Sequence, residues 1–94
     1  MDLIPTAEDR TAALEAYPEI FPGVYGDVVD RGAILFINVI FAAVEGSGQV
    51  GRYLDSLRDR RVHVTSVYSD RLAGMLARRG YRLSACSGSW EHEP

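Results

Sequence analysis

The chain has 94 residues, of which 47% are hydrophobic and 24% are charged, and its formal net charge is −3. These values are typical of one globular domain over residues 1–94, without internal repeats, and the single cysteine excludes an internal disulfide and a cysteine-based zinc cage. The longest apolar run, residues 33–44, is shorter than the ~20 residues of a membrane span, so we expect no membrane partner.

The first predicted element is a helix from Ala7 to Ala16. Thr6 is a suitable N-cap with an acid at the third helical position, and Tyr17-Pro18 ends the helix because the residue before a proline avoids helical geometry. Two prolines and two glycines between Pro18 and Gly26 then predict an irregular loop. The apolar side chains of this loop are expected to cover one face of the sheet or a partner.

The next segment, Val28–Val44, holds the strand material. Asp30-Arg31-Gly32 predicts a turn that joins Val24–Val29 to Ala33–Val44 in a hairpin, with a bulge near Asn38. Residues 33–37 are nearly continuous in apolar side chains, which is typical of a strand buried on both faces.

Two helices and further strands follow. Apolar residues at helical spacing predict an amphipathic helix over Ser47–Asp59, and Val62–Val67 is rich in β-branched residues and predicts a strand. Ser69 is a suitable N-cap for the last helix, which Gly80 ends. The strand ending near Val44 and the strand Val62–Val67 are expected to be parallel neighbours, with the helix between them as their crossover.

The C-terminal segment is the least regular. Tyr81–Cys86 alternates and predicts a final strand, with Cys86 as a small core residue. Trp90 is expected to end the ordered chain, which leaves His92 in an exposed tail.

The order of strand, glycine-rich turn, helix, strand and helix ending in Gly80-Tyr81 resembles the GNAT superfamily of acetyl-CoA-dependent N-acetyltransferases over residues 33–86. In that family a loop of pattern Gln/Arg-x-x-Gly-x-Gly/Ala and the following helix hold the cofactor pyrophosphate. The corresponding run here is Gly46-Ser47-Gly48-Gln49-Val50-Gly51. Its last glycine fits, whereas Gly46 replaces the leading basic or glutamine residue and Gln49 replaces the middle glycine. The tyrosine that often acts as general acid corresponds to Leu76.

The resemblance implies an α/β fold with a GNAT-like mixed sheet flanked by helices and truncated at its N-terminal side. Short, degenerate members of this fold occur in bacteriophages and mobile elements. The first hypothesis is therefore a non-catalytic protein-interaction or structural module without a cofactor, a virion component or a host-factor binder. The alternative is a small N-acetyltransferase that uses acetyl-CoA.

Two sets of residues are candidates for binding. Free backbone amides at a glycine-rich helix start can hold a phosphate, although the same residues also suit a flexible strand-to-helix connection. The candidate cofactor-binding residues are Ser47, Gly48, Gln49, Val50, Gly51 and Arg52. Large aromatic side chains are common anchors of interfaces but also cover small cores, and the candidates for a contact with a protein partner or a second copy are Phe21, Tyr25 and Trp90.

Other chemistry is less supported. No residues stand out as catalytic groups or metal ligands, and His63 is expected to be a half-buried strand histidine. All ten basic residues are arginines and eight of them lie in residues 48–82, which suits either solvated helix faces or a surface that binds anions or a partner. The acidic pI of about 5.2 argues against a nucleic-acid partner. The N-terminus lacks a signal-peptide core, so a cytoplasmic or virion-associated location is expected.

Overall fold

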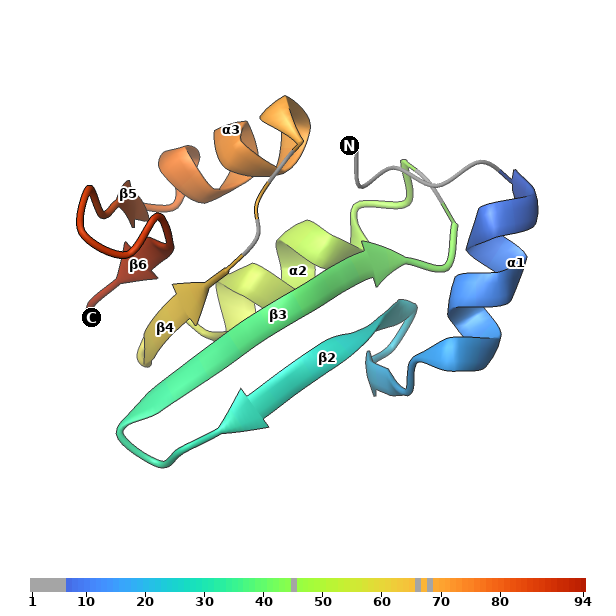
Figure 1. Cartoon of the computed structure of the whole chain (residues 1–94), viewed down its shortest axis with the longest axis horizontal. Coiled ribbons are helices and arrows are strands. Elements are labelled where there is room, and N and C mark those ends of the chain that lie inside the picture. Colours follow the sequence, from blue (N-terminus) through green and yellow to red (C-terminus); the bar gives the residue numbers. More distant parts are fainter. Residues whose placement is uncertain (1–6, 45, 66, 68) are drawn as a thin grey trace.

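The computed structural model describes residues 7–44, 46–65, 67 and 69–94. These residues form an α/β fold with three helices and one six-stranded mixed sheet (Figure 1). The helices are α1 (Ala7–Ala16), α2 (Gln49–Ser56) and α3 (Asp70–Arg78). The strands are β1 (Glu19–Phe21), β2 (Val24–Asp30), β3 (Ile34–Ala42), β4 (Arg61–Val64), β5 (Arg82–Leu83) and β6 (Trp90–His92), and their order in the sheet is β1-β2-β3-β4-β6-β5.

The hairpin of β2 and β3 is the longest pairing in the fold, and it was expected from the sequence. The two strands are antiparallel around the turn at Arg31 and Gly32, as predicted. The register steps from Asp27 opposite Val39 to Val28 opposite Ile37, so Asn38 is the extra residue of a bulge in β3. The prediction of a bulge at this position is confirmed.

The second predicted pairing is also present. β3 and β4 are parallel, with Leu35 opposite Val62 and Ile37 opposite Val64, and α2 connects them. A parallel pair needs such a crossover because the chain must return to the same end of the sheet. The helix and strand are shorter than predicted: α2 starts at Gln49, and β4 ends at Val64.

One apolar core lies between the sheet and the helices α2 and α3. Both helices contribute side chains to this core, and so do strands β2, β3 and β4 and Tyr81 before β5. Its fully buried members are Val24, Ile37, Leu54, Val62, Val64 and Leu76. The predicted cap of α3 is confirmed, because the Ser69 hydroxyl accepts a hydrogen bond from the Leu72 amide at 3.3 Å. Gly80 follows the helix with a φ of +85°, a conformation that favours glycine.

The C-terminal predictions are wrong in three respects. The final strand over Tyr81–Cys86 is only the two residues of β5, and Cys86 is exposed in the turn that follows instead of lying in the core. Trp90 does not end the ordered chain. It begins β6, which pairs with β4 and β5, and the His92 ring stacks on the buried Tyr81 ring at 4.8 Å.

The predicted irregular loop before Gly26 is also wrong. The two prolines flank the short strand β1, and the Pro18 carbonyl accepts a hydrogen bond from the Gly26 amide at 3.1 Å. Phe21 lies opposite Val24 in the register, so this segment adds an edge strand to the sheet.

None of the helices in the described part of the chain is both long and apolar enough to cross a membrane.

Candidate functional site

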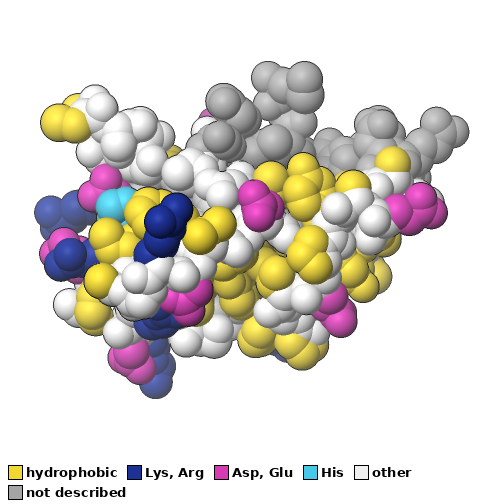
Figure 2. Space-filling view, turned by 60° about the horizontal axis from the view of Figure 1, so that its bottom comes forward, with side chains coloured by type: hydrophobic (Ala, Val, Ile, Leu, Met, Phe, Trp, Pro, Cys, Tyr) yellow, Lys and Arg dark blue, Asp and Glu magenta, His cyan; other side chains and the backbone are white. Residues whose placement is uncertain are grey.

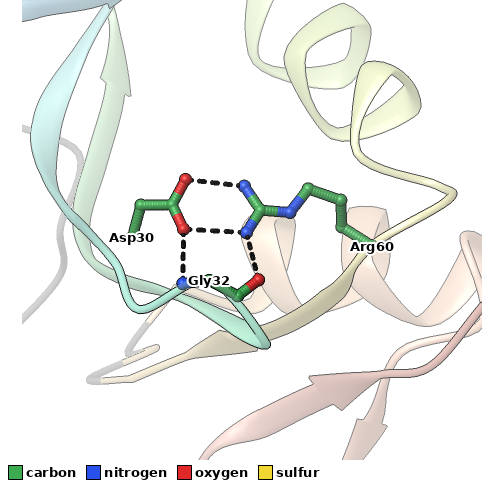
Figure 3. Close-up of polar contacts among 3 residues, drawn as sticks. All are labelled: Asp30, Gly32 and Arg60. Atoms are coloured by element: carbon green, nitrogen blue, oxygen red, sulfur yellow. Dashed lines mark hydrogen bonds and ion pairs between the residues drawn. The ribbon is translucent and has the colours of Figure 1, made fainter.

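The tip of the β2–β3 hairpin is fixed by an arginine from a distant part of the chain (Figure 3). The Arg60 guanidinium, just before β4, donates two hydrogen bonds of 2.9 Å to the two carboxylate oxygens of Asp30. The same guanidinium donates to the Gly32 carbonyl at 3.1 Å, and the Asp30 carboxylate accepts a hydrogen bond from the Gly32 amide at 2.8 Å. We call this set of hydrogen bonds among Asp30, Gly32 and Arg60 the tip clamp, and it holds the turn between β2 and β3.

The tip clamp changes the acidity of Asp30. The hydrogen bonds from Arg60, followed by the one from the Gly32 amide, lower the pKa of the Asp30 carboxyl from 3.8 to about 2. A bidentate arginine–carboxylate pair also fixes the relative orientation of its two planar groups. The backbone of Arg31 is held as well, because its amide donates to the Ile34 carbonyl and its carbonyl accepts from the Ala33 amide.

The face of the sheet opposite the core carries a row of side chains that crosses five strands. Successive strand residues point to opposite faces, so the partners of Phe36 lie on the side away from the buried Leu35 and Ile37. The row runs through Val29, Phe36, His63, Glu91 and Arg82. We call this side of the sheet, from Val29 to Arg82, the open face.

The open face is apolar at one end and charged at the other. The Phe36 and His63 rings meet edge to face with their centroids 5.3 Å apart, and His63 Nε2 lies 3.8 Å from the Glu91 carboxylate. On the apolar side, Val29 is 37% exposed, and Ile34 and Phe36 are half-buried. The prediction that β3 is buried on both faces is therefore wrong for these positions, because α2 and α3 pack only against the other face.

A hollow of about 450 Å³ lies at the apolar end of the open face. It is lined by Val29, Arg31, Ala33, Ile34, Phe36 and Asn38. The side-chain nitrogen of Asn38 donates to the Asp27 carboxylate at 3.3 Å, and its oxygen accepts from the Thr65 hydroxyl at 3.0 Å. The bulge residue therefore has partners for both ends of its amide, and it lines the hollow on the side away from the hairpin tip.

The surface chemistry changes along the molecule. In the space-filling view, hydrophobic side chains form patches across the face shown, arginine side chains gather toward its left end, and acidic side chains are spread over the whole face (Figure 2). The hairpin tip and the start of β4 lie at that end of the molecule (Figure 1). Apolar and charged groups therefore meet near the tip.

The predicted cofactor loop begins α2. Gly46 and Gly48 have φ values of +77° and +78°, and α2 has no side-chain N-cap. The Gln49 amide lies 3.4 Å from the Ser47 hydroxyl. Within the described residues, the amides of Val50 and Gly51 donate no hydrogen bond, so they could take an anion as helix N-termini do.

Two residues of this loop, Gln49 and Gly51, take part in contacts within the chain. The Gln49 side chain donates to the Pro22 carbonyl at 2.8 Å and accepts from the Arg52 guanidinium at 2.8 Å, which ties the loop to the β1–β2 turn. A Cβ on Gly51 would lie 2.7 Å from the Arg79 guanidinium, which pairs with Asp55 at 2.9 Å. The space beside Gly51 is therefore used for packing α2 against the end of α3.

The three predicted interface aromatics are not brought together. Phe21 and Trp90 are half-buried and pack against the core, and the Phe21 ring lies 5.3 Å from the Tyr53 ring. Tyr25 lies on the other side of the sheet, where its ring stacks on Phe41 with centroids 6.1 Å apart. Of the three, Tyr25 alone is on the open side.

The positions considered for catalysis and metal binding are placed as follows. Leu76, at the place of the family's tyrosine, is fully buried in the core. His63 is half-buried in β4, as predicted. The described residues include no cluster of three or more histidine, cysteine, aspartate or glutamate side chains that could hold a metal ion.

Sequence reasoning missed the hollow and its arginine. The signal was present, because residues 33–37 are apolar at every position, including those that face away from the core. An antiparallel strand covered on one face normally alternates apolar and polar residues. Comparison with protein-family models, curated proteins and solved structures gave no match for this chain.

Proposed function

We propose that this chain is a non-catalytic GNAT-like module that binds another protein through the open face of its sheet, as a virion component or a host-factor binder of a bacteriophage. The observation that carries the proposal is that β3 is apolar on both faces while α2 and α3 cover only one. A contiguous apolar patch rimmed by polar groups is typical of a protein interaction site.

The GNAT-like part of the proposal rests on the arrangement of elements. A central strand leads through a glycine-rich turn into α2, and α2 leads into a parallel neighbouring strand. The next helix, α3, ends at Arg78, and Gly80-Tyr81 follows its C-cap residue Arg79. This is the order that the resemblance requires, and a placement of β3 and β4 in different sheets would have argued against it.

The non-catalytic part rests on how the family's motif positions are used. Gln49 and Gly51 take part in internal contacts, and Leu76 is a core residue. The alternative, a small acetyl-CoA-dependent N-acetyltransferase, is favoured by the amides of Val50 and Gly51 at the start of α2, which donate no hydrogen bond to any residue that the structure describes.

The experiment compares partner recovery by three tagged proteins in the organism that encodes the chain. Phe36→Asp places a charge on the open face, whereas Arg58→Asp changes an exposed residue in the loop after α2. We expect one stoichiometric partner with the wild-type chain and with Arg58→Asp, and its loss with Phe36→Asp, provided that circular dichroism shows both variants folded. Recovery of the same partner with all three proteins would contradict the proposal.

A further inference from the structure

The hollow at the hairpin tip combines an apolar floor with the positive charge of Arg31, which has no ion-pair partner in the described part of the chain. Val29, Ile34 and Phe36 provide the floor, and the exposed Arg31 stands at its edge. The volume of the hollow, about 450 Å³, is within the range of about 300–1,000 Å³ that is usual for binding pockets. Within the described residues, the Arg31 guanidinium forms no ion pair.

The tip clamp does not compensate the charge of Arg31. Asp30 is adjacent in the chain, but both of its oxygens are occupied by Arg60, so these two charges neutralise each other. Arg31 therefore gives the tip a local charge of +1, from two arginines and one aspartate. Because the clamp also holds Gly32, the backbone on both sides of Arg31 is fixed before anything binds.

The far side of the hollow sets the orientation of a ligand. There Asn38 is engaged by Asp27 and Thr65, and the Asp27 carboxylate would repel an anion. A carboxylate is therefore favoured at the Arg31 end and disfavoured at the Asn38 end. Arginine is well suited to this task because its guanidinium can bind a carboxylate through two parallel hydrogen bonds.

We propose that the hollow receives a segment of the partner protein that inserts a large aliphatic side chain over Val29, Ile34 and Phe36 and pairs an adjacent carboxylate with Arg31. This inference rests on the proposed function, because it names the chemistry of the partner that the open face takes. The apolar contact excludes water from the ion pair, and the ion pair fixes the direction in which the segment lies.

The test is a titration of the ¹⁵N-labelled chain with three blocked tripeptides, followed by NMR. The probe acetyl-Leu-Asp-Leu-amide carries both groups, acetyl-Leu-Asn-Leu-amide lacks the charge, and acetyl-Ala-Asp-Ala-amide lacks the apolar side chains. We expect the first to shift the signals of Val29, Arg31 and Phe36. We expect each of the others to bind about tenfold more weakly, since a tenfold change is about the contribution of one hydrogen-bonded ion pair or one buried aliphatic side chain.

Variants separate this inference from its alternatives. Arg31→Gln should bind acetyl-Leu-Asp-Leu-amide no better than the asparagine peptide, while Arg58→Gln should behave as the wild type. Absence of shifts at the hollow, or equal binding of the aspartate and asparagine peptides, would overturn the inference. If Phe36→Asp still loses the cellular partner in that case, the proposed function stands and only the chemistry assigned to the hollow is wrong.

Discussion

The backbone carbonyl of Val39 lies directly against Gly26, across the β2–β3 hairpin and next to the bulge at Asn38. A Cβ built on Gly26 would overlap the Val39 oxygen and lie 2.8 Å from the Val39 carbonyl carbon. Both atoms belong to the backbone of the central hairpin, so they cannot move away as the end of a flexible side chain can. Gly26 is therefore required by the close approach of two strands.

This contact predicts that Gly26→Ala destabilises the fold by about 1–3 kcal/mol, the usual cost of overpacking a tight site. For a domain of this size each kcal/mol lowers the melting temperature by roughly 4–8 °C. The matched control is Gly74→Ala in α3, where the nearest atom to the new Cβ is the end of Arg78 at 3.5 Å. That change should raise stability by up to about 1 kcal/mol, because glycine weakens a helix. Equal melting temperatures for the two variants would contradict the close contact between Gly26 and the Val39 carbonyl.

The tip clamp predicts a specific acid dependence. The pKa of Asp30 is lowered from 3.8 to about 2 in the folded chain, so its contribution to stability is complete above pH 3.8 and is lost as the pH falls through about 2. Asp30→Asn should lower the urea midpoint at pH 7 and remove this part of the acid dependence. Asp59→Asn, an exposed change in the neighbouring loop, should keep it. If the difference in urea midpoint between the wild type and Asp30→Asn stays constant from pH 5 to pH 2, this would argue against the clamp.

A buried hydroxyl predicts a stabilising substitution. Tyr81 is 4% exposed, and its hydroxyl has no hydrogen-bond partner among the described residues. Because a buried unsatisfied polar group costs about 1–3 kcal/mol, Tyr81→Phe should raise the free energy of unfolding by an amount in this range. Chemical denaturation at pH 7 measures the difference. A destabilised Tyr81→Phe would show that the hydroxyl has a partner after all.

The same tyrosine predicts a loss of stability in alkali. Burial raises the pKa of Tyr81 from 10.0 to about 12, so between these values the unfolded chain loses its proton first. Stability should therefore fall as the pH rises from 10 to 12, by at most about 1.4 kcal/mol per pH unit. Tyr81→Phe should remove most of this slope, and the rest belongs to Tyr53, whose pKa is also raised by burial. An unchanged slope in the variant would contradict the assignment to Tyr81.

The alternative function has its own prediction. We expect acetyl-CoA to leave the melting temperature unchanged, because Gln49 and the space beside Gly51 are engaged in internal contacts. A ligand at 100 times its dissociation constant would add about 2.7 kcal/mol to the stability of the folded state, which thermal shift detects easily. A clear rise with the wild type that is lost in Gly51→Glu would favour the enzyme.

Local patterns in the sequence were sufficient to predict most of the central fold. The turn at Asp30–Gly32, the position of the bulge and the parallel pair around α2 follow from β-branched runs, glycine positions and helical spacing over short distances. β6 could not be predicted in this way, because it has only three residues, Trp90–His92, and two of them are polar. Its pairing with β4 joins residues about 30 apart, such as Val62 and His92.

In the candidate site, too, local motifs could be predicted from the sequence and contacts between distant residues could not. The loop from Ser47 to Arg52 is a local motif, and the structure keeps its six residues together at the start of α2. The tip clamp joins Asp30 to Arg60 across 30 positions, and nothing in either local sequence indicates the partner. The continuous apolar run of β3 predicted burial on both faces, but the sequence alone does not show that α2 and α3 share one face.

The most direct test of the central claim, that the open face binds a protein, is site-specific photo-crosslinking in the organism that encodes the chain. A photoreactive residue replaces Ile34 at the hollow or, as the control, Arg58 in the loop after α2. We predict one protein, identified by mass spectrometry, crosslinked strongly from position 34 and at background level from position 58. Equal crosslinking from both positions, or none from position 34 with a folded chain, would contradict the account.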